Sequence, residues 1–232
     1  MSPSLVVRDL GRQPYAETLE LQRDLARQRV AGELTEDVLL LVEHNPVITL
    51  GRGARPQSLP VPADELRGRG IEVYEVERGG DVTFHGPGQL VGYPIIDLRG
   101  HRADLHWYLR TLEAALIRAL DALSVGAATV AGLTGVWTRG RKVASIGIHV
   151  KQWVTYHGFA LNVFTDLAYF DLIVPCGIRD VVMTSVAMEL GRTDEPALWS
   201  ETRRAVVEAM MESFSGPLQA PVAFGRPISF SP

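Results

Sequence analysis

The sequence contains a single cysteine, Cys176, and its immediate neighbours are unusual for a residue of the hydrophobic core. Free cysteine is commonly a small buried hydrophobe. Cys176, however, lies between Pro175 and Gly177, directly after the apolar run 172–174. A strand that ends in Pro-Cys-Gly presents its sulfur at a stiff corner with space beside it. Such a thiol could attack a substrate carbonyl, so we consider Cys176 a candidate nucleophile.

A nucleophilic thiol needs a partner that favours its ionised form, and Lys142 is the first candidate. A thiol with a pKa of about 8.5 is only a few per cent ionised at pH 7, and a nearby ammonium stabilises the thiolate. Lys142 shares strand parity with Ala144 and Ile146, which predicts that it points inward at the start of a strand. It could also receive the thiol proton. The competing interpretation is a solvated hairpin lysine.

A cysteine–histidine pair is the usual alternative. His85 is the most interesting histidine because it ends a glycine-rich loop. His101 and His106 are predicted at the surface, and His149 and His157 are predicted as ordinary strand residues. No pair has the spacing of a helical zinc motif, and one cysteine provides little thiolate ligation. We therefore expect no metal, and the sequence suggests no cofactor.

The glycine-rich loop has the sequence RGGDVTFHGPGQ over residues 78–89. Adjacent glycines expose backbone N–H groups, so Arg78-Gly79-Gly80 could cradle a phosphate. The segment is neither a Walker loop nor a dinucleotide-binding fingerprint. A plain hairpin turn is the competing interpretation.

Regular elements surround these residues. Leucines at steps of three and four predict an amphipathic helix from residue 104 to 123, with the leucines in the core. The remaining pattern predicts helices at 15–30, 63–67 and 197–214, and strands at 5–10, 38–42, 71–76, 90–98, 135–138, 142–150 and 154–163. Because strands follow one another with few helical crossovers, we expect an α+β fold with a mixed, largely antiparallel sheet packed with helices.

The composition is that of an ordinary globular protein, with 46% apolar and 22% charged residues among 232. We expect one domain over 1–232, with a loosely packed tail from 216 to 232 that is rich in proline and glycine. A net charge of −4 argues against a nucleic-acid-binding role. No signal peptide or membrane-spanning run is recognisable, which predicts a cytoplasmic protein without a membrane partner.

Four segments together resemble one known family. They are RGGDVTFHGPGQLVGYPIIDL (78–98), GVWTRGRKVASIGIHV (135–150), HGFALNV (157–163) and IVPCGI (173–178). In order and spacing they are similar to the lipoyl(octanoyl) transferases, also called lipoate-protein ligase B. The resemblance covers roughly residues 35–215 and implies a catalytic core like that of biotin and lipoate protein ligases.

The resemblance also implies an activity and a set of site residues. The activity is transfer of an octanoyl group from octanoyl-acyl carrier protein to a lysine of lipoyl domains, in 2-oxoacid dehydrogenases and the glycine cleavage H protein. A thioester on Cys176 would be the intermediate, and Lys142 matches the dyad lysine of the family. The implied acyl pocket is lined by Arg78, Gly79, Gly80, Asp81, Val82, Thr83, Phe84, His85, Ser145, Ile146, Gly147, Gly158, Phe159 and Ala160. Among these, Phe84, Ile146 and Phe159 are expected to supply apolar walls.

Two other functions remain open at this point. One is an ATP-dependent lipoate or biotin ligase on the same fold, with Lys142 binding a phosphate. The other is a module that binds acyl groups or carrier proteins without catalysis, in which Cys176 only packs. The basic residues Arg139, Arg141 and Lys142 are either solvated charges or a landing site for an acidic protein partner.

Overall fold

The computed structural model describes residues 4–174, 181–193 and 195–215. In this part of the chain, seven strands form the main sheet in the order β1-β2-β6-β10-β9-β8-β7. Their bounds are β1 (Leu5–Gln13), β2 (Asp37–His44), β6 (Gln89–Ile95), β10 (Val154–Asn162), β9 (Arg141–Lys151), β8 (Leu133–Thr138) and β7 (Ala128–Val130). Strands β1 and β2 are parallel and every other neighbouring pair in this sheet is antiparallel.

A smaller sheet of three strands has the order β4-β3-β5. Its strands are β3 (Val47–Leu50), β4 (Glu72–Glu75) and β5 (Val82–His85), and β3 is parallel to β4 and antiparallel to β5. The sequence pattern predicts only β4. Strands β3 and β5 have four residues each, too few for an alternating pattern to identify.

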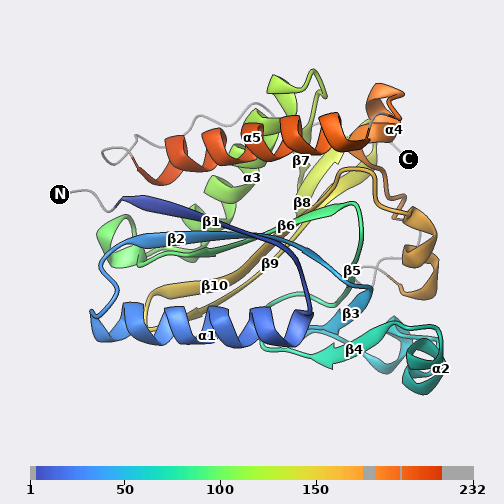
Figure 1. The fold of residues 1–232 in the computed structure, drawn as a ribbon, viewed down its shortest axis with the longest axis horizontal. Helices are drawn as coiled ribbons and strands as arrows, with labels where there is room; N and C mark the ends of the chain where they lie inside the picture. The colour runs from blue at the N-terminus through green and yellow to red at the C-terminus, as the bar shows by residue number, and fades with distance from the viewer. Residues whose placement is uncertain (1–3, 175–180, 194, 216–232) are drawn as a thin grey trace.

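Helices cover both faces of the main sheet (Figure 1). Helix α1 (Tyr15–Ala31) lies on one face, and α3 (Leu105–Ala122) and α5 (Glu195–Phe214) lie together on the other. Two shorter helices, α2 (Ala63–Gly68) and α4 (Val186–Leu190), lie outside these layers, and 3₁₀ turns occur at Pro56–Ser58, Leu98–Gly100 and Leu167–Leu172. The predicted α+β fold with a mixed, largely antiparallel sheet is therefore confirmed.

The two faces of strand β2 pack into two different hydrophobic cores. Leu39 and Leu41 pack with residues of α3 and α5, whereas Val38, Leu40 and Val42 pack with Leu25 and Ala26 of α1. Successive side chains of a strand point to opposite faces. A continuous apolar run is consequently the right pattern for a strand that is covered on both sides.

Helix α3 begins where the sequence predicts, because the Asp104 carboxylate accepts hydrogen bonds from the backbone N–H groups of His106 and Trp107. Leu112, Leu116 and Leu120 of the leucine stripe are fully buried, as expected. Leu105 is 44% exposed, so the stripe reaches the core only after the first turn.

The prediction that His101 lies at the surface is wrong. Its side chain is only 7% exposed, and its Nε2 lies 2.6 Å from Oδ2 of the fully buried Asp37. Asp37 Oδ1 also accepts hydrogen bonds from the side chain of Arg29 and from the backbone N–H of Asp97. This pairing joins residues more than sixty positions apart, so no local sequence pattern predicts it.

No helix in the described ranges combines the length and apolarity that crossing a membrane would require. The predicted tail, 216–232, lies outside the described residues.

Candidate active site

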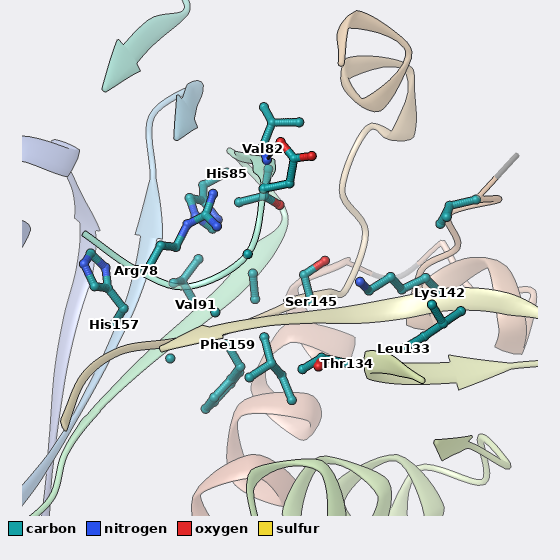
Figure 2. A pocket seen from close by; sticks show the side chains of 18 of the residues that line it. Arg78, Val82, His85, Val91, Leu133, Thr134, Lys142, Ser145, His157 and Phe159 are labelled. Carbon is teal, nitrogen blue, oxygen red and sulfur yellow. Dashed lines mark hydrogen bonds between the residues drawn. The ribbon is translucent and has the colours of Figure 1, made fainter. Parts of the chain in front are cut away.

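A cavity of about 250 Å³ lies between the small sheet and strands β8, β9 and β10 of the main sheet (Figure 2). It brings together four stretches that are far apart in the sequence: residues 78–85, 132–137, 142–147 and 157–160. Among the predicted site residues, Lys142, Arg78, Gly80, Asp81, Val82, Thr83, His85, Ser145, Ile146, Gly147, Gly158, Phe159 and Ala160 line it.

Of the predicted site residues that the structure describes, two are not in the lining. Gly79 pairs with β9 instead, through a 2.8 Å hydrogen bond from its N–H to the carbonyl of Ile148. Phe84 is fully buried in the core of the small sheet, where its ring stacks on Tyr169 at a centroid distance of 4.4 Å. The expectation that Phe84 forms an apolar wall of this cavity is wrong. Alternation along β5 places Phe84 on the face opposite to Thr83 and His85, which line the cavity, and directs it into the core of the small sheet.

Arg78 is a fixed part of the cavity wall. It is only 7% exposed, and its guanidinium donates to the side-chain and main-chain oxygens of Thr49 in β3. Its Nη1 also donates to the carbonyl of Gly79 at 3.1 Å. Because these bonds join the segment 78–81 to the small sheet, Arg78 holds one side of the cavity in place.

The opposite wall depends on a close approach of two strands. A Cβ atom at Gly158 would lie 2.2 Å from the carbonyl oxygen of Gly92, and one at Gly92 would lie 2.2 Å from the ring of Phe159. The absence of side chains there lets β10 and β6 approach closely and places the Phe159 ring across Gly92.

Lys142 lies near the start of β9, just after a tight turn. The turn residues Arg139 and Gly140 have φ angles of 48° and 77°, a combination typical of a two-residue type I′ hairpin. Lys142 is 2% exposed, and its Nζ lies 5.5 Å from the centre of the Trp137 ring. Its side chain extends along the cavity toward Ser145 (Figure 2). The inward orientation expected from strand parity is therefore observed.

The backbone of Lys142 is bound on its outer side by residues 182–184. Its N–H donates to the carbonyl of Val182 at 2.8 Å, and its carbonyl accepts from the N–H of Thr184 at 3.0 Å. Cys176 lies outside the described residues, so its position relative to Lys142 stays a prediction. Val181, five positions after Cys176, lines the same cavity as Lys142.

The far end of the cavity is unexpectedly polar. Tyr15, His85, Tyr93 and His157 line it. His85 Nδ1 lies 2.8 Å from Gln89 Oε1, and burial together with nearby His44 lowers the pKa of His85 to about 3. His85 is therefore neutral and suited to hydrogen bonding rather than to carrying charge.

His157 is not an ordinary strand residue, contrary to the prediction. Its φ is 56°, in the left-handed region that residues with side chains rarely adopt, and its N–H donates to Gln22 Oε1 at 2.9 Å. Its Nε2 lies 3.9 Å from Glu77 Oε2. Burial lowers the pKa of His157, while His157 and hydrogen bonds from Arg23 and Tyr156 hold the pKa of Glu77 well below its usual range. A neutral imidazole beside a carboxylate is the result.

The predicted basic cluster is partly neutralised. Arg141 Nη2 lies 2.8 Å from Oε1 of the buried Glu189, and Arg139 Nη1 lies 3.7 Å from its Oε2. In the described residues no group of three or more histidine, cysteine, aspartate or glutamate side chains could hold a metal ion.

Comparison with known proteins identifies the family. Residues 14–215 match the model of the lipoyl protein ligase A/B catalytic domain. The chain belongs to this family. Proteins named octanoyltransferase are 48% identical over 205 residues in Nostoc sp. strain PCC 7120 and 56% identical over 179 residues in Gloeobacter violaceus. These matches cover 88% and 77% of this chain and 89% and 78% of the relatives.

Solved structures share the fold of this catalytic domain at low sequence identity. A bi-partite lipoate protein ligase from Thermoplasma acidophilum has a TM-score of 0.68 at 16% identity, covering 94% of this chain and 86% of its own. LipL1 of P. falciparum, in complex with lipoate, has a TM-score of 0.69 at 13% identity. The match covers 92% of this chain and 62% of the LipL1 chain.

Sequence reasoning missed several lining residues of this lipoyl protein ligase A/B catalytic domain. Tyr15 comes from α1, Tyr93 from β6, and Leu133 and Thr134 from β8. Tyr15 and Tyr93 carry no local signal, because only the packing of α1 and the strand order bring them to the cavity. Leu133 and Thr134 directly precede the GVW segment, so its match to the family could have suggested them.

Proposed function

We propose that this protein is an octanoyltransferase of protein lipoylation. It moves an octanoyl group from octanoyl-acyl carrier protein to a lysine of a lipoyl domain, in 2-oxoacid dehydrogenases or the glycine cleavage H protein. Membership of the lipoyl protein ligase A/B family and relatives named octanoyltransferase at about half identity support this proposal.

The proposed first step forms a thioester on the enzyme. The thiolate of Cys176 attacks the carbonyl carbon of the donor thioester, and the bond from that carbon to the carrier sulfur breaks. The carrier thiolate leaves and takes a proton from the ammonium of Lys142. The enzyme then holds an octanoyl-Cys176 thioester and a neutral Lys142 amine.

The second step returns the enzyme to its starting state. The amine of the acceptor lysine attacks the octanoyl carbonyl, an amide bond forms, and the thiolate of Cys176 leaves. One proton of the attacking amine passes to Lys142, which becomes an ammonium again. Because an amide is more stable than a thioester, the cycle needs no ATP.

The observation that carries the proposal is the buried position of Lys142 in the wall of a cavity that also has apolar surfaces. Ile146 and Phe159 line the same cavity, and burying methylene groups contributes about 0.8 kcal/mol each. An octanoyl chain could gain several kcal/mol there. The position of Val181 in the same lining supports a cysteine on the adjoining segment as the nucleophile.

Intact-mass measurement after incubation with octanoyl-acyl carrier protein tests this function. Wild type should gain one octanoyl group, and Cys176→Ala should gain none. Lys142→Ala should acquire the group about a hundredfold more slowly, because it lacks the proton donor and the charge that favours the thiolate. The absence of an adduct on wild type, or an equal adduct on Cys176→Ala, would contradict the thioester mechanism.

The same preparation distinguishes the alternatives. An ATP-dependent ligase would release pyrophosphate from ATP and free octanoate, whereas a transferase would not. A binding module would retain octanoyl-acyl carrier protein without modifying Cys176 and without acylating a lipoyl domain.

A further inference from the structure

The path of the Lys142 side chain is set by the absence of a side chain at Gly135. A Cβ atom at Gly135 would lie 2.7 Å from Cε and 3.3 Å from Nζ of Lys142. Real Cβ atoms essentially never approach another heavy atom to 2.7 Å. The backbone of Gly135 also has a φ of 125°, which L-residues rarely adopt. Lys142 therefore extends directly across the Cα atom of Gly135.

A buried carboxylate holds Gly135 in this conformation. Glu113 in α3 is 0% exposed, and its Oε1 accepts a 3.1 Å hydrogen bond from the backbone N–H of Gly135. Its other oxygen pairs with Arg110, whose side chain is 45% exposed. Burying a carboxylate is unfavourable unless it is paired and hydrogen-bonded, and Glu113 meets both conditions.

Leu112 and Leu116 of α3 pack against the sheet through apolar contacts, so α3 does not need a carboxylate to hold it there. The carboxylate instead binds the backbone N–H of Gly135, the residue that the lysine side chain passes. We propose that Glu113 is a positioning residue for Lys142 and acts through Gly135. The proposal rests on the role of Lys142 in the proposed function, and it adds a residue of α3 to the residues on which the reaction depends.

The test uses an unusual property of the sequence. It contains two lysines, the buried Lys142 and the exposed Lys151. Acetylation by limiting acetic anhydride, followed by peptide mass spectrometry, gives the labelling ratio of Lys142 to Lys151 within one molecule. This ratio reports the placement of Lys142 whether or not the protein transfers octanoyl groups.

In Glu113→Ala we expect the labelling ratio to rise about tenfold, since a hydrogen bond to a charged group contributes roughly 1.5 kcal/mol or more. We expect kcat for octanoyl transfer to fall by about the same factor with little change in KM, as for an interaction needed in the transition state. Glu113→Gln retains an oxygen that can accept from Gly135, so it should restore both values to within about threefold.

Gly135→Ala should raise the labelling ratio further, because its Cβ displaces the lysine. Its control is Gly32→Ala, which also places an alanine at a positive φ, 78°, but with nothing within 4 Å of the added Cβ. The control should lower the melting temperature and leave the labelling ratio unchanged.

An unchanged labelling ratio in folded Glu113→Ala would overturn the proposal, as would a Glu113→Gln variant that behaves like Glu113→Ala. A loss of melting temperature alone would mean that Glu113 only anchors α3. If Lys142→Ala transfers octanoyl groups at the wild-type rate, the proposed mechanism fails, while the labelling ratio still decides whether Glu113 positions the lysine.

Discussion

At the scale of single residues, His44 and His85 are buried as neutral imidazoles. His44 Nε2 lies 2.8 Å from the hydroxyl of Tyr93, and burial lowers the pKa of His44 to about 4. The pKa of His85 is lowered further, to about 3. In the unfolded chain both imidazoles would titrate near 6.5. Between these values the unfolded state binds more protons than the folded state.

Stability should therefore be fully present above about pH 6.5 and should decrease as the pH falls toward 4. From about pH 7.5 to about pH 5, each of these two histidines should account for a loss of about 2 kcal/mol in the free energy of unfolding. Urea titrations of wild type and His44→Gln at the two pH values test this. The variant should lose about 2 kcal/mol less than wild type, and the exposed His106→Gln should lose as much as wild type.

Strand parity predicted the inward orientation of Lys142, and the resemblance to the lipoyl(octanoyl) transferases implied most of the cavity lining. They misplaced Phe84, because the sequence does not reveal that β5 belongs to a second sheet with its own core. They also missed the strained backbone of His157, which depends on the Gln22 side chain from α1. Local pattern identifies which side chains share a face, and long-range packing decides what that face covers.

At the scale of elements, α4 fixes the segment that binds the backbone of Lys142. The side chain of Glu189 in α4 is buried. Its Oε1 accepts a 2.6 Å hydrogen bond from the hydroxyl of Thr184 and also forms an ion pair with Arg141. Thr184 in turn donates its N–H to the carbonyl of Lys142. One carboxylate therefore joins α4, the segment 182–184 and β9.

Replacing this carboxylate should loosen the segment. In Glu189→Ala we expect the amides of Lys142 and Thr184 to exchange hydrogen about tenfold or more faster, because a buried, charge-assisted hydrogen bond contributes roughly 1.5–3 kcal/mol. Hydrogen exchange resolved by mass spectrometry measures this. Glu208→Ala, at an exposed position of α5, is the matched control. Equal exchange in the two variants would show that Glu189 does not hold the segment.

Helices and long strands were the most predictable elements, because their apolar residues recur with a regular period and because residues that begin or end an element are visible in the sequence. The bounds of α1 and α3 agree with the prediction to within one or two residues. The order of the strands was not predictable, because β6 pairs with β2 and β10, each separated from it by long stretches of chain. In the folded chain α1 packs against one face of these strands, and α3 with α5 packs against the other.

At the scale of the whole molecule, the cluster predicted to receive acidic protein partners presents one main charge to solvent. The Arg141 side chain is 33% exposed and is paired closely with Glu189, whereas Arg139 is 74% exposed and its nearest contact to that carboxylate is 3.7 Å. Electrostatic attraction of a partner should therefore depend chiefly on Arg139.

Arg139→Glu should slow octanoyl transfer from acyl carrier protein several-fold at about 20 mM salt and much less at about 200 mM, because salt screens exposed charges. Initial rates at the two salt concentrations give the comparison. Arg27→Glu makes the same charge change on the exposed surface of α1 and should leave the rates unchanged. Equal rates for Arg139→Glu and wild type at low salt would assign partner attraction to other residues.

The two-residue turn at Arg139 and Gly140 has a consequence for how this site could be altered by evolution or design. Thr138 pairs directly with Arg141 across the turn, and side chains alternate from there along β9. Inserting or deleting one residue in the turn would present Arg141 or Val143 to the cavity in place of the amine. The length of this turn thus decides which side chain enters the cavity, and a change of one residue there would be equivalent to a point mutation of Lys142.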